Sequence, residues 1–170
     1  MNCSRRYTIL VLFAGIVFLA DQLTKIWIHK TLRLGEGISI IPGLLDLHYI
    51  RNTGAAFGFL SGTHSTFRIP FFIGISVVAI GVIFYLFRKI EDSMVLIPLA
   101  LSLVLGGALG NLIDRIRLGE VIDFILIHYQ RFHWPAFNVA DTAITVGVFL
   151  LLYHILFPGK RELPAPSSSA

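Results

Sequence analysis

Four long apolar segments constrain the fold of this chain more than any other feature of its sequence. They lie at about residues 7–28, 67–87, 95–113 and 137–157. Each is long enough to supply the roughly 20 helical residues that cross about 30 Å of hydrocarbon. A backbone inside a bilayer must satisfy its own hydrogen bonds, which restricts such segments to helices. The sequence therefore predicts an all-α integral membrane protein, with four transmembrane helices in a single domain over residues 1–158.

Composition supports the membrane class and argues against two other classes of protein. Only 14% of the 170 residues are charged, whereas a soluble domain carries roughly 25%. The net charge is +4, but the basic residues are scattered singly or in pairs, which argues against a nucleic-acid partner and favours contact with membrane lipids. Cys3 is the single cysteine, so the chain can form no internal disulfide and no cysteine-rich metal site.

The distribution of basic residues bears on the orientation of the helices. An even number of helices places both termini on one side and the loops 31–66 and 114–136 on the other. Six basic residues lie on the terminal side and eight on the loop side, so a raw count is indecisive. Three compact basic pairs nevertheless favour a cytoplasmic location for both termini: Arg5-Arg6, Arg88-Lys89 and Lys160-Arg161. We expect residues 159–170, which include PAPSSSA, to form a disordered cytoplasmic tail.

The first loop has the sequence pattern of a small β-sheet. Apolar residues on both sides of the turn Pro42-Gly43 indicate two short strands. The residues that carry this pattern are Ile38, Ile40 and Ile41 before the turn, and Leu45, Leu47, Tyr49 and Arg51 after it. We expect the sheet to rest on the membrane surface.

Two aspartates lie in very apolar surroundings, where an ionised carboxylate costs roughly 2.5–3.5 kcal/mol at bilayer depth. Asp141 follows Asn138 by three residues, so it could complete a capping box at the start of the fourth helix. Asp123 could be a surface charge on an amphipathic segment. Each explanation is reasonable separately, but both residues near the same membrane face favour a functional pair.

A pair of carboxyl groups suggests a specific chemistry. Two carboxyls about 3 Å apart share one proton, so one can deprotonate water while the other protonates a substrate carbonyl. This predicts peptide-bond hydrolysis that needs no metal and no other cofactor. The alternatives are a small proton-coupled transporter, which the lack of a detectable inverted repeat disfavours, and a non-catalytic membrane scaffold.

Further polar residues extend the candidate site. Asn111, Asp114 and Arg115 end the third apolar segment. Arg115 could form a surface ion pair of little value with Asp114, or it could be a structural clamp or a contact for a substrate headgroup. Gly106 and Gly110 form a G-x-x-x-G face that allows close helix approach.

Two other polar groups have alternative interpretations. Asp21 and Lys25 are spaced i,i+4 on the first helix and could simply neutralise each other. Asn52 has an amide suited to a peptide backbone, beside Gly54, although both could only hold a turn.

Two histidines invite a metal interpretation that we do not favour. His128 and His133 lack helical register with each other, and no third ligand converges with them and Asp123. We expect them to belong to an aromatic belt at the membrane interface.

Four sequence blocks together resemble the bacterial lipoprotein signal peptidases, also called signal peptidase II. The blocks are NTGAAF (52–57), GGALGNLIDR (106–115), VIDF (121–124) and FNVADTAI (137–144). The resemblance implies an intramembrane aspartyl protease of the bacterial inner membrane. Its substrates would be diacylglyceryl-modified prolipoproteins, cleaved just before the lipidated cysteine. We expect it to act as a monomer.

The resemblance also assigns roles to residues, position by position. It implies that Asp123 and Asp141 are the catalytic dyad, and that Asp21, Lys25 and Asp114 are structural. The positions that would line or support the site are Asn52, Gly54, Asn111, Arg115, Asn138 and Ala140. The family places the active site near the periplasmic face, with the small sheet as a cradle for the substrate.

Overall fold

Four long helices dominate the computed structural model, which describes residues 5–54, 64–91 and 94–157. The helices are α1 (Arg5–Thr31), α2 (Ser65–Arg88), α3 (Leu96–Leu118) and α4 (Val139–Leu156). All four are long and apolar enough to cross a membrane, which confirms the predicted multi-pass helical fold. Cys3, the tail 159–170 and the second half of the block NTGAAF lie outside the described residues.

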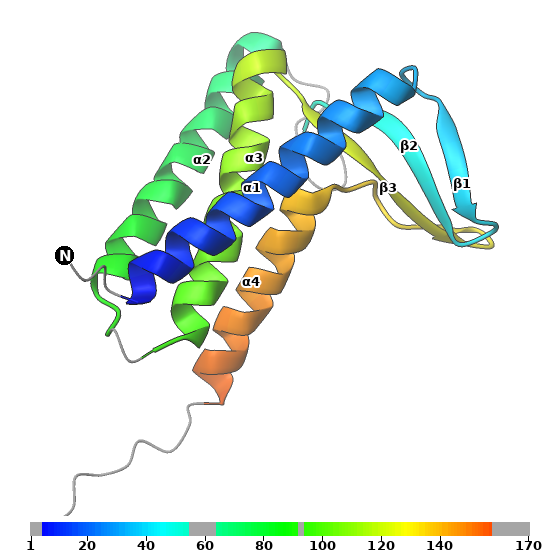
Figure 1. Cartoon of the computed structure of the whole chain (residues 1–170). Coiled ribbons are helices and arrows are strands. Elements are labelled where there is room, and N and C mark those ends of the chain that lie inside the picture. The colour runs from blue at the N-terminus through cyan, green and yellow to red at the C-terminus, as the bar shows by residue number, and fades with distance from the viewer. Residues whose placement is uncertain (1–4, 55–63, 92–93, 158–170) are drawn as a thin grey trace, which may run out of the picture.

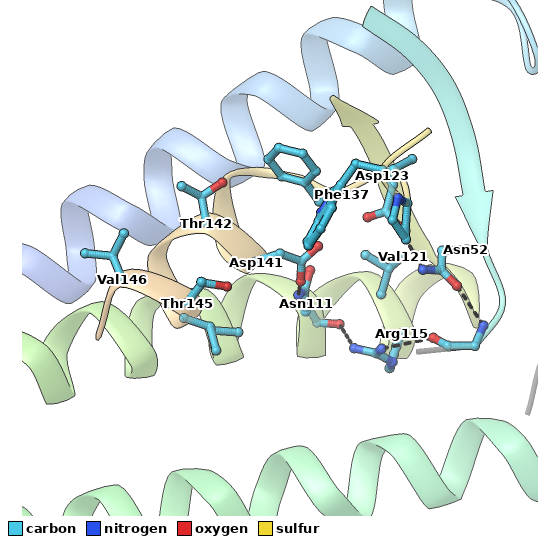
Figure 2. A pocket seen from close by; sticks show the side chains of 15 residues that line it. Asn52, Asn111, Arg115, Val121, Asp123, Phe137, Asp141, Thr142, Thr145 and Val146 are labelled. Carbon is cyan, nitrogen blue, oxygen red and sulfur yellow. Dashed lines mark hydrogen bonds between the residues drawn. The ribbon is translucent and has the colours of Figure 1, made fainter. Parts of the chain in front are cut away.

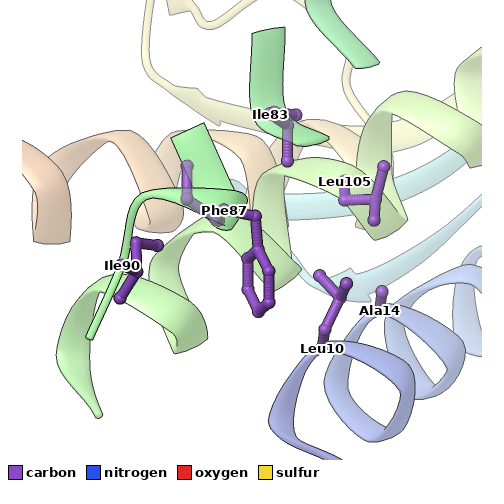
Figure 3. Close-up of a cluster of buried hydrophobic side chains, with 7 residues drawn as sticks. Leu10, Ala14, Ile83, Phe87, Ile90 and Leu105 are labelled. Carbon is purple, nitrogen blue, oxygen red and sulfur yellow. The ribbon is translucent and has the colours of Figure 1, made fainter. Parts of the chain in front are cut away.

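The helix α3 lies at the centre of the bundle, where it packs against each of the other three helices (Figure 1). A buried apolar cluster joins α1, α2 and α3 at one end of the bundle (Figure 3). The residues of this cluster are Leu10, Ala14, Ile83, Phe87, Ile90, Leu101 and Leu105. The start of α1 and the end of α4 lie at the end of the bundle that is farther from the sheet (Figure 1). The sheet lies at the opposite end and is formed by the segments between α1 and α2 and between α3 and α4, whereas the α2–α3 connection packs beside the start of α1.

Glycines on α3 allow α1 and α4 to approach it closely. A Cβ atom on Gly106 would lie 2.7 Å from the Ala14 carbonyl oxygen of α1, and one on Gly107 would lie 2.4 Å from the Ala140 carbonyl oxygen of α4. A Cβ on Gly110 would lie 2.4 Å from Asp21 Oδ2. These contacts confirm the predicted close-packing role of Gly106 and Gly110. Because lipid supplies no hydrophobic drive between helices, such packing is a main source of their association.

The small sheet has four antiparallel strands in the order β1-β2-β3-β4. Strands β1 (Gly37–Ile41) and β2 (Leu45–Asn52) confirm the hairpin predicted in the first loop, and β3 (Val121–Tyr129) and β4 (Phe132–His133) come from the second loop. The sequence pattern did not reveal β3, because its first four residues are all buried and show no alternation of apolar and polar positions. Asp123 therefore lies on a strand, opposite Ile50 of β2, and not on an amphipathic surface segment.

Two helix boundaries near the site differ from the prediction. The third segment was expected to end near residue 113, but α3 continues to Leu118, where Gly119 ends it with a φ of 72°. Glycine adopts this left-handed conformation without steric strain. The fourth helix begins at Val139, two residues later than expected, because Asn138 caps it. Asp114 and Arg115 therefore lie inside α3, one turn before its end.

Candidate active site

A cavity of about 500 Å³ lies where α3, α4, β3 and the end of β2 meet (Figure 2). Six of the predicted site residues line it: Asn52, Gly54, Asn111, Arg115, Asp123 and Asp141. Asn138 and Ala140 are fully buried and contact these residues from behind. The structure thus brings together side chains that are up to 89 positions apart in the sequence, from Asn52 to Asp141.

Asp123 reaches the cavity from β3 and is only 1% exposed. Its Oδ2 accepts a hydrogen bond from Asn52 Nδ2 at 2.8 Å, and its Oδ1 accepts one from Asn138 Nδ2 at 2.7 Å. Burial raises the pKa of Asp123 to about 7, and the charge of Asp141 adds to this effect, while the two amide donors oppose it. Near neutral pH this carboxyl is therefore populated in both its protonated and its ionised form.

Asp141 occupies the third position of α4, where both interpretations of the sequence apply. Its backbone N–H donates to Asn138 Oδ1 at 2.9 Å, and the Asn138 N–H donates to Asp141 Oδ2 at 3.3 Å. This capping box confirms the structural interpretation. The carboxyl also lines the cavity, where Oδ1 accepts a hydrogen bond from Asn111 Nδ2 at 2.8 Å. The positive end of the helix dipole favours a negative charge at this position.

Asn138 connects the two aspartates directly. Its Nδ2 donates to Asp123 Oδ1, while its Oδ1 accepts the N–H of Asp141. The same Nδ2 also lies 3.2 Å from Asn111 Oδ1 and from the Ile122 carbonyl oxygen. One buried amide side chain therefore contacts both halves of the proposed dyad.

A buried ionic triad lies behind the cavity. Lys25 Nζ lies 2.8 Å from Asp21 Oδ2 and 2.8 Å from Asp114 Oδ2, and it donates to Asn111 Oδ1 at 2.9 Å. The three charged residues are at most 3% exposed. The predicted i,i+4 pair of Asp21 and Lys25 is thus present, but its third charged partner, Asp114 of α3, was not predicted. No local pattern could reveal it, because it depends on how α1 packs against α3.

Arg115 makes the contacts of a clamp. Its guanidinium donates to the carbonyl oxygens of Asn111, at 3.3 Å, and Gly54, at 3.5 Å. It also lies over the Phe72 ring, 4.9 Å from the centroid. Arg115 therefore ties α3 to α2 and to the end of β2, and its side chain also lines the cavity.

Asn52 holds the predicted turn and also contacts Asp123, a partner that the sequence did not reveal. Its Oδ1 accepts the N–H of Gly54 at 2.9 Å, which holds the turn after β2. Its Nδ2 donates to Asp123. The turn therefore fixes the orientation of the amide that contacts the carboxyl (Figure 2).

The two histidines lie on the sheet. His128 Nε2 lies 2.8 Å from Asp46 Oδ2, and its ring stacks on that of His133 with 5.7 Å between centroids. Among the described residues, no three His, Cys, Asp or Glu side chains form a group that could hold a metal ion. Asp46 was not anticipated as the partner of His128.

Part of the cavity wall does not follow from the sequence motifs. Thr142, Thr145 and Val146 of α4 line the cavity and are exposed. Helical periodicity could have found Thr145, because it follows Asp141 by four residues and shares its face. The aromatic wall formed by Trp134 and Phe137 carried no comparable signal.

Comparison with known proteins identifies the family. The family model for signal peptidase (SPase) II matches residues 13–157. The chain belongs to the signal peptidase II family. The lipoprotein signal peptidase of Geobacter sulfurreducens is 52% identical over 144 residues, which cover 85% of this chain and 89% of that protein. The lipoprotein signal peptidase of Syntrophus aciditrophicus is 50% identical over 158 residues, which cover 90% and 97%.

Solved structures of similar proteins agree with the fold. A bacterial membrane enzyme solved by the in meso method at 2.3 Å resolution shares 36% identity, with a TM-score of 0.80 over 90% of this chain and 92% of that one. A second such structure, at 1.9 Å resolution, shares 37% identity with a TM-score of 0.74, covering 86% and 91%. Within this signal peptidase II fold, residues that line the cavity come from Asn52 and Gly54 and from the blocks 106–115, 121–124 and 137–144.

Proposed function

We propose that this chain is an aspartic endopeptidase that removes signal peptides from diacylglyceryl-modified prolipoproteins by cleaving before the lipidated cysteine. Membership of the signal peptidase II family supports a peptidase that acts on lipoprotein precursors. The observation that carries the aspartic assignment is that Asp123 and Asp141 line one cavity and contact the same buried side chain, Asn138. The comparisons give no support to the transporter alternative.

In the proposed reaction one water molecule is consumed, and no covalent enzyme intermediate forms. Ionised Asp141 takes a proton from water, whose oxygen attacks the scissile carbonyl carbon, while protonated Asp123 gives its proton to the carbonyl oxygen. The tetrahedral intermediate then collapses with cleavage of the C–N bond: a proton passes from Asp141 to the leaving nitrogen, and a hydroxyl proton of the intermediate returns to Asp123, which restores the starting protonation states.

Two observations support this division of roles. Asp141 lies at the N-terminus of α4, which favours its ionised form, whereas burial raises the pKa of Asp123 to about 7. Both side-chain hydrogen bonds to Asp123 come from amide N–H donors. These donors favour the ionised form of Asp123, so its raised pKa comes from burial and from the charge of Asp141, which outweigh them.

The shape of the cavity fits a substrate that is held in the bilayer. One wall of the cavity belongs to α4, a helix apolar enough to span the membrane. The exposed residues of α4 in this wall are Thr142, Thr145 and Val146. A peptide with a lipid anchor could therefore enter sideways from the hydrocarbon. We propose an inner-membrane location, with the sheet and the cavity at the periplasmic face and both termini in the cytoplasm. We also propose action as a monomer, because contacts within one chain satisfy both aspartates.

A cleavage assay tests the proposal. The full chain, purified in detergent, is expected to cleave a diacylglyceryl-modified prolipoprotein and to leave the same precursor without the lipid essentially uncut. A chelator should not change the rate, because the proposed reaction uses only side chains and water. Failure to cleave the lipidated precursor, together with proton-driven flux in liposomes, would favour a transporter instead.

The pH dependence of cleavage should be bell-shaped. The rate should fall as pH rises through about 7, because Asp123 then loses the proton that it donates. It should also fall at low pH, where the pair gains a second proton and no base remains. The measurement is kcat/KM against pH, whose two limbs belong to the pair. A rate that rises steadily to high pH would contradict a shared proton.

A further inference from the structure

The buried triad of Asp21, Lys25 and Asp114 has contacts that its charge balance does not explain. Asp21 Oδ1 accepts the backbone N–H of Ala140 at 2.9 Å. Asp114 Oδ2 accepts the backbone N–H of Ile122 at 3.2 Å. Ala140 and Ile122 are the residues immediately before Asp141 and Asp123. Each carboxylate of the triad thus holds the backbone next to one member of the proposed dyad.

Lys25 joins these two attachments. Its ammonium group has three N–H donors, and it has three partners in the structure: Asp21, Asp114 and Asn111. Asn111 in turn donates to Asp141 Oδ1. A single buried cation therefore connects to the backbone before each aspartate and to the carboxyl of one of them.

Stability alone is a weak explanation for this arrangement. Desolvation of buried charges is costly, and apolar residues of similar volume often stabilise a protein as well or better. The neighbouring packing also accommodates the triad, because a side chain on Gly110 would place its Cβ 2.4 Å from Asp21 Oδ2. An arrangement that is costly to bury and is attached on both sides of a reaction site is better explained by a role in geometry.

We propose that Asp21, Lys25 and Asp114 form a positioning unit that sets the separation of Asp123 and Asp141. They do not touch the substrate, and they act through Ala140, Ile122 and Asn111. The inference rests on the proposed dyad and goes beyond a general structural role. Hydrolysis by two carboxyls that share a proton depends on their spacing, and a misplacement of about 1 Å can reduce a rate about 100-fold.

The pH–rate profile distinguishes positioning from stability. The separation of its two limbs reports how strongly the carboxyls interact, and it shrinks if they move apart. A change of nearby charge moves both limbs together instead. A loss of folded protein lowers the amplitude and leaves the limbs in place. The charged groups near the dyad are Asp21 and Lys25 from α1, and Asp114 and Arg115 from α3.

The experiment compares two substitutions of Asp114 in the full chain, with a lipidated prolipoprotein as substrate. Asp114→Ala removes both the acceptor for the Ile122 N–H and the charge, so kcat should fall about 100-fold with KM little changed, and the limbs should move to lower pH and also converge. Asp114→Asn keeps an acceptor oxygen but loses the charge, so both limbs should move to lower pH with their separation retained. Ser102→Ala provides a control, because Ser102 is buried in α3 and donates to the Pro98 carbonyl oxygen.

If Asp114→Ala does not fold, Asp114→Ser supplies a smaller change. The serine hydroxyl is too short to contact both Lys25 and the Ile122 N–H, so the same convergence of the limbs is expected. Suppose that the wild-type chain is active and that the Ala or Ser variant only lowers the maximum rate, without changing the separation of the two limbs of the pH–rate profile. This result would overturn the positioning role and leave the proposed function intact. An inactive wild-type chain would instead contradict the proposed function itself. Equal limb separations in the Ala and Asn variants would also overturn the inference.

Discussion

Asp123→Asn and Asp141→Asn should each reduce cleavage of a lipidated prolipoprotein by about 1,000-fold or more. Each substitution keeps the shape of the side chain but removes a group that must gain or lose a proton, and general acid or base catalysis contributes roughly 100- to 10,000-fold. The asparagine at position 123 can still accept a hydrogen bond from Asn52 or Asn138, so the fold should persist. The measurements are kcat/KM and the thermal unfolding of each variant in detergent.

Asp46→Asn is the matched control for the dyad. Asp46 lies on β2 and contacts His128 Nε2 at 2.8 Å, and it is not among the residues that line the cavity. The same chemical change at this position should leave cleavage close to wild type. Substantial activity in either dyad variant would remove that aspartate from the proposed mechanism. Loss of activity in all three variants would indicate a general effect of the substitution on the protein.

Gly107→Ala should be among the most damaging single-methyl changes in the bundle. The added Cβ would lie 2.4 Å from the Ala140 carbonyl oxygen and 2.8 Å from Ile144 Cγ1. Backbone cannot move aside as a flexible side chain can, so α4 must shift away from α3. We expect a destabilisation of about 1–3 kcal/mol. Because Ala140 precedes Asp141, we also expect an approximately 10- to 100-fold lower kcat.

Gly81→Ala is the control for this packing prediction. Gly81 also lies within a spanning helix, α2, but a Cβ there would meet nothing within 4 Å. Its substitution should leave kcat unchanged, and removal of a helical glycine can add up to about 1 kcal/mol of stability. Thermal unfolding and initial rates of both variants provide the test. Similar behaviour of the two variants would show that the close approach of α3 and α4 does not limit this protein.

The capping box at the start of α4 shows how a local motif can be predicted and still be incomplete. The spacing of Asn138 and Asp141 predicts the cap, and the structure contains it. The same two side chains also reach Asp123 and Asn111. A motif of neighbouring residues reveals its local hydrogen bonds, but it cannot show which distant groups use the remaining lone pairs and N–H donors.

The strand β3, in contrast to the capping box, has no local motif that predicts it. Its sequence, VIDFILIHY, has no alternating pattern at its start because its first four residues are buried. It becomes a strand by pairing with β2, from a loop about 70 residues earlier in the chain. Strand pairing over such a distance depends on the helices that hold the two loops at one end of the bundle. The position of Asp123 therefore could not follow from its local sequence.

The sequence by itself determined the four membrane-spanning helices, the hairpin of the first loop and six of the residues that line the candidate site. Hydrophobic length, turn chemistry and short motifs are local properties, and they can be read along the chain. The tertiary structure decided that Lys25 contacts Asp21, Asp114 and Asn111. It also decided that Asp21 and Asp114 accept the backbone N–H groups of the residues just before Asp141 and Asp123. A buried ion must be satisfied in three dimensions, so its partners depend on how α1, α3 and α4 pack together.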